Sequence, residues 1–229
     1  MFRCLFFALL FCFPLHAAEV QSHGYQWERW VQDTFFDGYR VENYTQEWDV
    51  NREANKKYGG VPVSIKFTKY GTSVDLGDAI RQFSIDEKFM IIIGYWKQEG
   101  NRKRVVNIVA PVLTPEEWHK LFEPIKKEDL ENLDGVVKNR DLPHRQAALE
   151  ASKIKRAKPF TQALMTLNPK IDSKGQRRLQ CSLRFDYVFK HLVPNADKSA
   201  QEKPQLFGID APPPFLSNPR QFKKDKDTQ

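Results

Sequence analysis

KFMIIIGYW, from Lys88 to Trp96, is a nearly unbroken apolar run of strand length. Apolar runs of this length are typical of strands that are buried on both faces of a sheet. A turn at residues 99–101 (EGN) follows, and the next run, from Arg104 to Leu113 (RVVNIVAPVL), is rich in β-branched residues. We therefore expect the two runs to pair as a hairpin at the centre of the fold.

The chain before this hairpin alternates between helix and strand patterns. Tyr25 to Tyr39 places aromatic and aliphatic side chains at helical spacing, which predicts an amphipathic helix. Polar and apolar residues alternate from Tyr44 to Val50, and Val61 to Tyr70 (VPVSIKFTKY) is rich in β-branched and aromatic residues, so both segments are predicted strands. Leu76 to Phe83 (LGDAIRQF) is predicted to be a helix.

Helices dominate the predicted structure after the hairpin. Thr114 followed by Pro115 and Glu117 is the pattern of a capped helix start. Further helices are expected at Lys127–Asn139 and Pro143–Lys158. Together with the strands, these patterns indicate a mixed α/β domain with helical C-terminal additions.

Three later segments are less regular. Thr161 to Asp172 is expected to end in a turn at Asn168-Pro169, and Arg178 to Leu192 fits either a strand or a helix. Residues 198–229 are rich in proline and lysine, and we expect this tail to be partly disordered. The folded domain is then expected to comprise residues 19–197.

The N-terminus has the pattern of a secretory signal. One positive charge, Arg3, precedes the apolar run from Cys4 to Pro14, and Ala17 and Ala18 offer a cleavage point. The run is shorter than the ~20 apolar residues that a membrane span needs. We therefore expect residues 1–18 to be a cleaved signal, which implies an exported (periplasmic or secreted) protein with no stable membrane span. The alternatives are an uncleaved anchor, or a misassigned start and a cytoplasmic protein.

Net charge, cysteine content and the absence of common catalytic motifs limit the functions that this sequence can have. The formal net charge of +7 favours polyanionic partners such as nucleic acid or acidic lipid. Cys181 is the only cysteine outside the predicted signal, so we expect no intrachain disulfide in the mature protein. The sequence has no Gly-rich phosphate loop, no Gly-x-Ser-x-Gly elbow and no His-Glu-x-x-His pair, and its five histidines are widely scattered.

One set of charged residues fits metal-dependent chemistry. Glu47 and Asp49 are expected on one face of the first strand, and Lys66 on the second, with Ser64 on the same face as Lys66. Carboxylates can hold Mg²⁺ through their oxygens, and a lysine can polarise the attacking water or the phosphate. A solvated sheet offers similar cross-strand charge pairs, worth ~0.2–1 kcal/mol and carrying no activity. Spacing by itself leaves both interpretations open.

The order of these elements resembles a known nuclease core. A helix, a strand with Asp, a strand with x-x-Lys and a helix with Gln form the core pattern of the PD-(D/E)XK nuclease superfamily, to which restriction endonucleases belong. The stretches QEWDV, VPVSIKFTKYGTSVDLGDAIRQF and IDSKGQRRLQCSL are similar to restriction-endonuclease-like bacterial proteins. The resemblance to the core covers roughly residues 25–113. It implies a restriction-endonuclease-like mixed sheet flanked by helices.

The resemblance also implies roles for individual residues. Asp49 would be the first metal ligand and Lys66 the catalytic lysine. Glu28, on the first helix, would match an extra acid that some members place there, and Gln82 a glutamine that some place after the lysine.

Two positions depart from the family pattern. Trp48 rather than proline precedes Asp49, and Ser64 stands where the family normally has Asp or Glu. A hydroxyl cannot supply the charge of a carboxylate. Either another acid compensates, or the domain binds nucleic acid without cutting it. The acids considered for this role are Glu47, Glu28 and Asp78.

A basic stretch outside the resembling core predicts contacts with DNA. Lys170 to Arg184 (KIDSKGQRRLQCSLR) mixes basic residues with Gln and Ser. Arg and Lys neutralise phosphates, and Gln can pair with base edges. The run Lys153–Lys158 (KIKRAK) fits phosphate contacts and a solvated helix face equally well. The residues expected to contact DNA are Lys174, Arg177, Arg178 and Gln180.

The sequence therefore predicts a Mg²⁺-dependent DNA endonuclease. Two alternatives stay open: a catalytically degenerate protein of the same fold that binds nucleic acid without cutting it, and a non-enzymatic exported envelope protein. Which DNA sequence is recognised, and whether the protein forms a homodimer, is left open as well. The expected catalytic group is Asp49, Lys66, Glu47 and Ser64, and the expected metal ligands are Asp49, Glu47 and Glu28.

Overall fold

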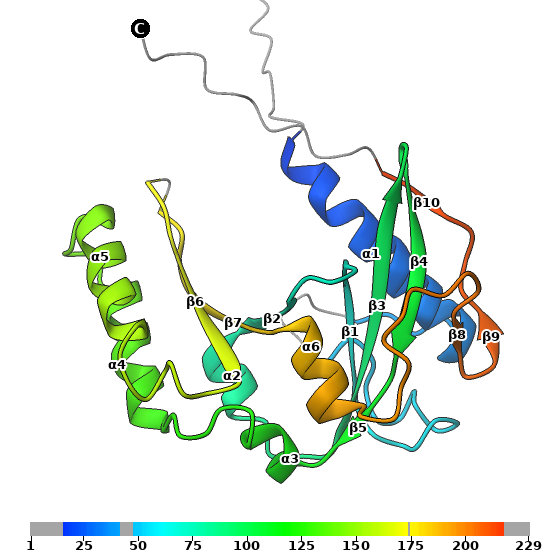
Figure 1. The fold of residues 1–229 in the computed structure, drawn as a ribbon, viewed down its shortest axis with the longest axis horizontal. Coiled ribbons are helices and arrows are strands. Elements are labelled where there is room, and N and C mark those ends of the chain that lie inside the picture. The colour runs from blue at the N-terminus through cyan, green and yellow to red at the C-terminus, as the bar shows by residue number, and fades with distance from the viewer. Residues whose placement is uncertain (1–15, 42–47, 174, 218–229) are drawn as a thin grey trace, which may run out of the picture.

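The computed structural model describes residues 16–41, 48–173 and 175–217, which form a mixed α/β fold (Figure 1). The larger sheet has the strand order β1–β3–β4–β10, and β5 also pairs with β3. β1 runs parallel to β3, and the other neighbours are antiparallel, so the sheet is mixed as expected. Its strands are β1 Val63–Lys69, β3 Phe89–Glu99, β4 Arg102–Val109, β5 Val112–Leu113 and β10 Phe215–Leu216.

The expected central hairpin is formed by β3 and β4, with Ile93 opposite Val109. All residues of β3 as far as Tyr95 are buried, which confirms that this part of the strand is covered on both faces. Successive side chains of a strand point to opposite faces. They therefore enter two different cores, Ile92 in one and Ile93 in the other.

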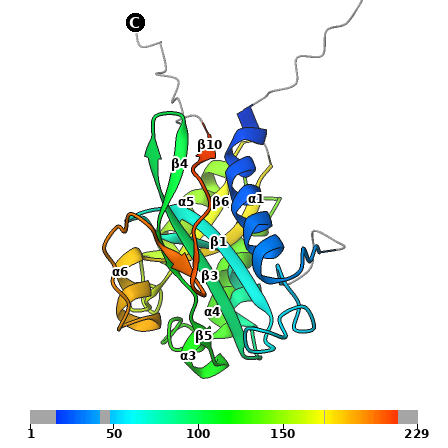
Figure 2. The ribbon, with the colours of Figure 1, turned by 90° about the vertical axis from the view of Figure 1, so that its right-hand side faces the viewer.

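Helix α1 (His16–Phe35) lies across one face of the larger sheet (Figure 2). It begins well before the predicted start at Tyr25 and includes the expected cleavage point. The predicted signal up to residue 15 lies outside the described residues. The indole of Trp27 packs over Gly94 of β3, where a Cβ atom would lie 2.7 Å from two ring carbons. Glycine at this position is what allows the helix to approach the sheet so closely.

The second sheet has the order β2–β7–β6 and is antiparallel. The prediction of a helix at Leu76–Phe83 is wrong in its first half, which belongs to β2 (Val74–Asp78). The helix α2 is confined to Ala79–Phe83. β2 pairs with β7 (Arg177–Leu183), which is distant in the sequence, and this long-range pairing overrides the local helical pattern.

β6 (Met165–Ile171) contains Asn168-Pro169, so the predicted turn at these residues is wrong. β6 is the edge strand of its sheet, and a residue without an N–H group is tolerated at a sheet edge. The segment Arg178–Leu192, whose pattern fits either a strand or a helix, contains both. Its strand β7 is followed by the helix α6 (Phe185–Tyr187) and a π-helical turn at Val188–Leu192.

Three helices connect the two sheets and confirm the predicted order. They are α3 Pro115–His119, α4 Lys127–Lys138 and α5 His144–Lys155. The predicted capping box at the start of α3 is present, since Glu117 N–H donates to Thr114 Oγ1 and the carboxylate of Glu117 accepts from the N–H of Thr114. The C-terminal additions are thus helices together with the β6–β7 hairpin. Of the helices in the described ranges, none has the length and apolar character to cross a membrane.

The first part of the predicted tail, after Asp197 and as far as Ser217, packs along β4 (Figure 2). Asn107 Nδ2 donates to the carbonyls of Asp197 and Ser199, and the N–H of Ser217 donates to the carbonyl of Asn101. These hydrogen bonds, together with the short strands β8 (Gln205–Leu206) and β9 (Ile209–Asp210), hold this proline-rich segment, and its Leu206 is buried in the core beneath α1. Residues 218–229 lie outside the described part of the chain.

Candidate functional site

Asp49 lies at the open edge of β1. Its backbone N–H donates to the carbonyl of Val63 at 3.0 Å, and Val50 forms an antiparallel bridge with the same residue. Beyond Val63 the Asp49 side chain, in place of a backbone carbonyl, binds the edge of β1: its Oδ2 accepts the N–H of Ile65 at 2.6 Å. The carboxylate is therefore held by a short hydrogen bond to the strand that carries Lys66.

Lys66 and Asp49, which the sequence pattern predicts to face each other across neighbouring strands, form an ion pair. The Lys66 ammonium lies 3.6 Å from Asp49 Oδ2 and donates to the carbonyl of Ile65 at 3.3 Å. The Lys66 side chain is 21% exposed and that of Asp49 is 31% exposed. The pair is thus partly withdrawn from solvent, where charge interactions are stronger than on an open surface.

Glu28 reaches the same place from α1. Gln32, one turn later on the helix and almost fully buried, donates to Glu28 Oε1 at 3.4 Å and to the carbonyl of Asp49 at 3.0 Å. Gln32 therefore ties the helix to the segment that carries the Asp49 carboxylate. Sequence reasoning missed this residue, although its spacing of four from Glu28 places both on one helix face.

The environment of Glu28 disfavours its charged form. Burial is the largest cause that raises the pKa of this carboxyl group, and the nearby Asp49 carboxylate raises it further, whereas Lys66 lowers it. Two carboxylates that repel each other beside one ammonium group form a pair that a cation would stabilise.

A pocket of about 170 Å³ brings these elements together. It is lined by Glu28 of α1, Lys66 of β1 and, from β2, Asp75, an acid that the sequence interpretation did not single out. The signal was hidden because Asp75 lies between the predicted strand Val61–Tyr70 and the predicted helix Leu76–Phe83, and the strand character of β2 depends on its pairing with β7. The remaining lining residues are Gly24, Trp27, Ile65, Phe67, Thr68 and Val74.

Several other predicted residues are engaged elsewhere. Ser64 lies on the same strand as Lys66 and is buried. Gln82 is buried on α2, and its carbonyl accepts the indole N–H of Trp118 at 2.9 Å. Asp78 caps α2 through the N–H of Arg81. None of the three replaces a carboxylate at Lys66.

Glu47 lies outside the described residues, as does most of the predicted strand Tyr44–Val50. Within the described ranges no group of three or more His, Cys, Asp or Glu side chains is arranged to hold a metal ion. Mg²⁺ commonly uses only one or two carboxylates and completes its shell with water and substrate phosphate. Asp49 and Glu28 fit a site of this type. Two carboxylates are too few to supply all the ligands of a metal ion.

The predicted DNA-contacting residues divide into two kinds. Arg178 is exposed on β7 and Gln180 is half-buried. Arg177 instead donates to the carbonyls of Leu142 at 2.8 Å and Val137 at 3.4 Å, so its guanidinium group holds the loop between α4 and α5. Lys174 lies outside the described residues.

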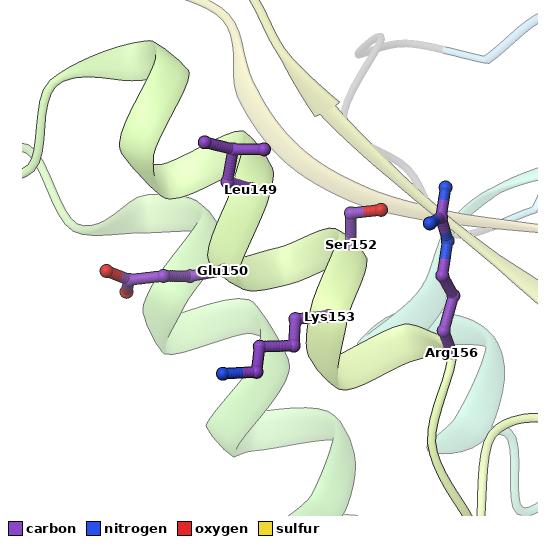
Figure 3. A pocket seen from close by; sticks show the side chains of 5 residues that line it. All are labelled: Leu149, Glu150, Ser152, Lys153 and Arg156. Atoms are coloured by element: carbon purple, nitrogen blue, oxygen red, sulfur yellow. The ribbon is translucent and has the colours of Figure 1, made fainter.

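A second, larger pocket of about 500 Å³ lies beside α5 (Figure 3). It shares no lining residue with the pocket at Lys66 and offers two cations and a single acid. The lining residues are Leu149, Glu150, Ser152, Lys153 and Arg156.

Comparison of this chain with models of protein families, with curated proteins and with solved structures finds no match. Inference about function therefore depends on the geometry described above.

Proposed function

We propose that this protein is a Mg²⁺-dependent DNA endonuclease with a restriction-endonuclease-like core. The observation that carries the proposal is the pairing of Lys66 with Asp49 at 3.6 Å beside the partly buried Glu28. A surface charge pair requires no second carboxylate, and carboxyl groups whose charged form is disfavoured are enriched at functional sites. The order of helix, Asp segment and lysine strand supports the same proposal.

The residues suggest a division of labour. Asp49 and Glu28 would hold the ion, which when bound polarises the phosphate and lowers the pKa of a water molecule. Lys66, held between Asp49 and the carbonyl of Ile65, would donate hydrogen bonds to the attacking water or to a non-bridging phosphate oxygen. Gln32 would position Glu28 without touching the substrate.

A nucleic-acid-binding protein without nuclease activity is the second candidate. The buried Ser64 favours it, because this position lacks the carboxylate that the nuclease family uses. Such a protein would bind DNA in a salt-sensitive manner and would need no metal.

A plasmid-cleavage assay on the purified chain separates the two candidates. Mg²⁺-dependent nicking that is lost in Asp49→Asn and in Lys66→Ala, and retained in Lys69→Ala, is the expected result. Lys69 is a suitable control because it is an exposed lysine on the same strand. A folded protein that binds DNA and cuts none of it with Mg²⁺ or Mn²⁺ would instead establish the binding protein.

A further inference from the structure

The positive charge of this chain is concentrated in one segment. Residues 138–184 contain 12 Lys and Arg and 3 Asp and Glu, whereas the rest of the chain contains 24 and 26. The segment forms α5, β6 and β7, at the side of the molecule away from α1 (Figure 1). We call residues 138–184 the basic arm.

Cations in the arm face each other without a compensating acid. Lys170 of β6 stands directly opposite Arg178 of β7, and both are exposed. Lys155, at the end of α5, lies close enough to Lys170 and Arg156 to interact with their charges. Burial is the main cause that lowers the pKa of Lys155, and these two positive charges lower it further. Within the described ranges, none of these four side chains forms an ion pair with an acid.

Such an arrangement costs stability in the absence of a partner. Like charges directly opposite each other in a sheet are destabilising. The partner that removes this cost is an anion with several charges at regular spacing.

A polar surface leads from the pocket at Lys66 to these cations. Along β7, Leu179, Cys181 and Leu183 enter the core, so the alternate residues face the other way. This face holds the buried Ser182 opposite Asp75, which lines the pocket, and then becomes more exposed through Gln180 to Arg178. From Ser182 to Arg178 the strand rises by ~14 Å, which corresponds to the rise of about four base pairs of duplex DNA.

We propose that the basic arm binds the sugar–phosphate backbone of duplex DNA, with Lys170, Arg178 and Lys155 contacting phosphates several base pairs from the phosphate held at Lys66. The position relative to Lys66 rests on the proposed nuclease function, and the binding of the backbone by the arm does not.

The composition of the arm favours DNA over a lipid surface. The amide groups of the half-buried Asn168 and Gln180 lie between the cations and the pocket, as in surfaces that contact phosphate and base edges. Stable attachment to a lipid surface also requires buried apolar area. Among the described residues of the arm, Leu149 is the single large apolar side chain that is well exposed.

The test measures binding of a fluorescein-labelled DNA duplex to the full chain in EDTA as a function of salt, by fluorescence anisotropy. Lys170→Ala/Arg178→Ala should reduce the slope of log K against log salt by about 2 and weaken binding roughly tenfold at low salt. Lys155→Ala should reduce the slope by about 1. Removing the exposed like-charged pair should not destabilise the fold, so a binding defect in this variant reports on contacts.

Lys56→Ala/Lys203→Ala is the matched control, because both lysines are exposed and lie outside the arm. Unchanged binding by the arm variant, or an equal loss in the control, would overturn the proposal. So would arm-dependent binding to phosphatidylserine-containing vesicles without binding to the duplex. Arm-dependent binding to DNA together with no cleavage in Mg²⁺ would refute the nuclease function and leave the arm established. Normal DNA binding and normal cleavage by the arm variant would refute the role of the arm and leave the nuclease function established.

Discussion

Charged side chains are arranged differently in two regions of the molecule: the region around α1 and β1, and the basic arm. Near α1, cations are paired with acids: Lys66 with Asp49, and Arg40 with Asp33 at 2.6 Å. In the arm, cations such as Lys170 and Arg178 are set against each other. A matched and partly buried group of charges is suited to holding a few atoms in a fixed geometry. An unmatched and exposed group is suited to an extended anion, whose own charges complete it.

The largest effect is expected from Lys66→Ala, which separates chemistry from binding. Cleavage should fall by about a thousandfold, because the ammonium group at the proposed metal site is lost. Binding of duplex DNA in EDTA should change little, since the arm is intact. Single-turnover cleavage and anisotropy on the same preparation measure both. Equal losses of cleavage and of DNA binding would mean that the site at Lys66 and the basic arm do not have separate functions.

Packing around α1 gives the largest expected effect on stability. In Gly94→Ala the new Cβ atom would lie 2.7 Å from ring carbons of Trp27 and 2.9 Å from Phe67. Overpacking of this kind costs about 1–3 kcal/mol, which corresponds to a decrease of roughly 5 °C in the melting temperature. Gly135→Ala in α4 is the control, because nothing lies within 4 Å of its Cβ position. That change should stabilise the protein, and a lower melting temperature for it would contradict the packing argument.

Two neighbouring arginines sharpen the comparison within the arm. Arg177→Ala removes hydrogen bonds to the carbonyls of Leu142 and Val137 and should lower the free energy of unfolding by about 1–3 kcal/mol. Arg178→Ala removes an exposed cation and should leave stability unchanged or slightly raised. Urea denaturation of both variants measures the difference. If both are equally stable, Arg177 is not the structural member of the pair.

The smallest effect concerns Glu28 and depends on pH. The folded pKa of Glu28 lies above its ordinary value of 4.5, so the folded state binds this proton more tightly than the unfolded state does. Stability from this group is therefore present below pH 4.5 and is lost as the pH rises through the raised pKa. Glu28→Gln should raise the melting temperature at neutral pH in EDTA and give no gain in acid. Mg²⁺ should stabilise the wild type more than the variant; an equal effect would remove Glu28 from the metal site.

Local patterns were sufficient for the central hairpin, the capped start of α3 and the Asp49–Lys66 pair. In each case the deciding interaction lies within a short stretch: apolar continuity in β3, a capping box over four residues, or two neighbouring segments joined by one loop. The alternation of a strand then places Lys66 without knowledge of the rest of the fold.

Patterns failed where a distant segment decides the outcome. Val74–Asp78 is a strand because it pairs with β7, and Pro169 is tolerated because β6 forms an edge. Residues 198–217 pack along β4 because Asn107 and the β4 backbone bind their carbonyl and N–H groups. The same pairing of β2 with β7 places Asp75 at the pocket.

The sequence by itself determined the mixed α/β class, the central hairpin and the proximity of Asp49 to Lys66, because all three follow from local periodicity and chain connectivity. The tertiary structure alone decided that Glu28 and Asp75 line one pocket with Lys66, that Arg177 is structural, and that the unmatched cations gather on one arm. The physical reason is that electrostatic and hydrogen-bond partners are set by distance in space. That distance depends on which strands and helices pack together, which no local pattern of residues specifies.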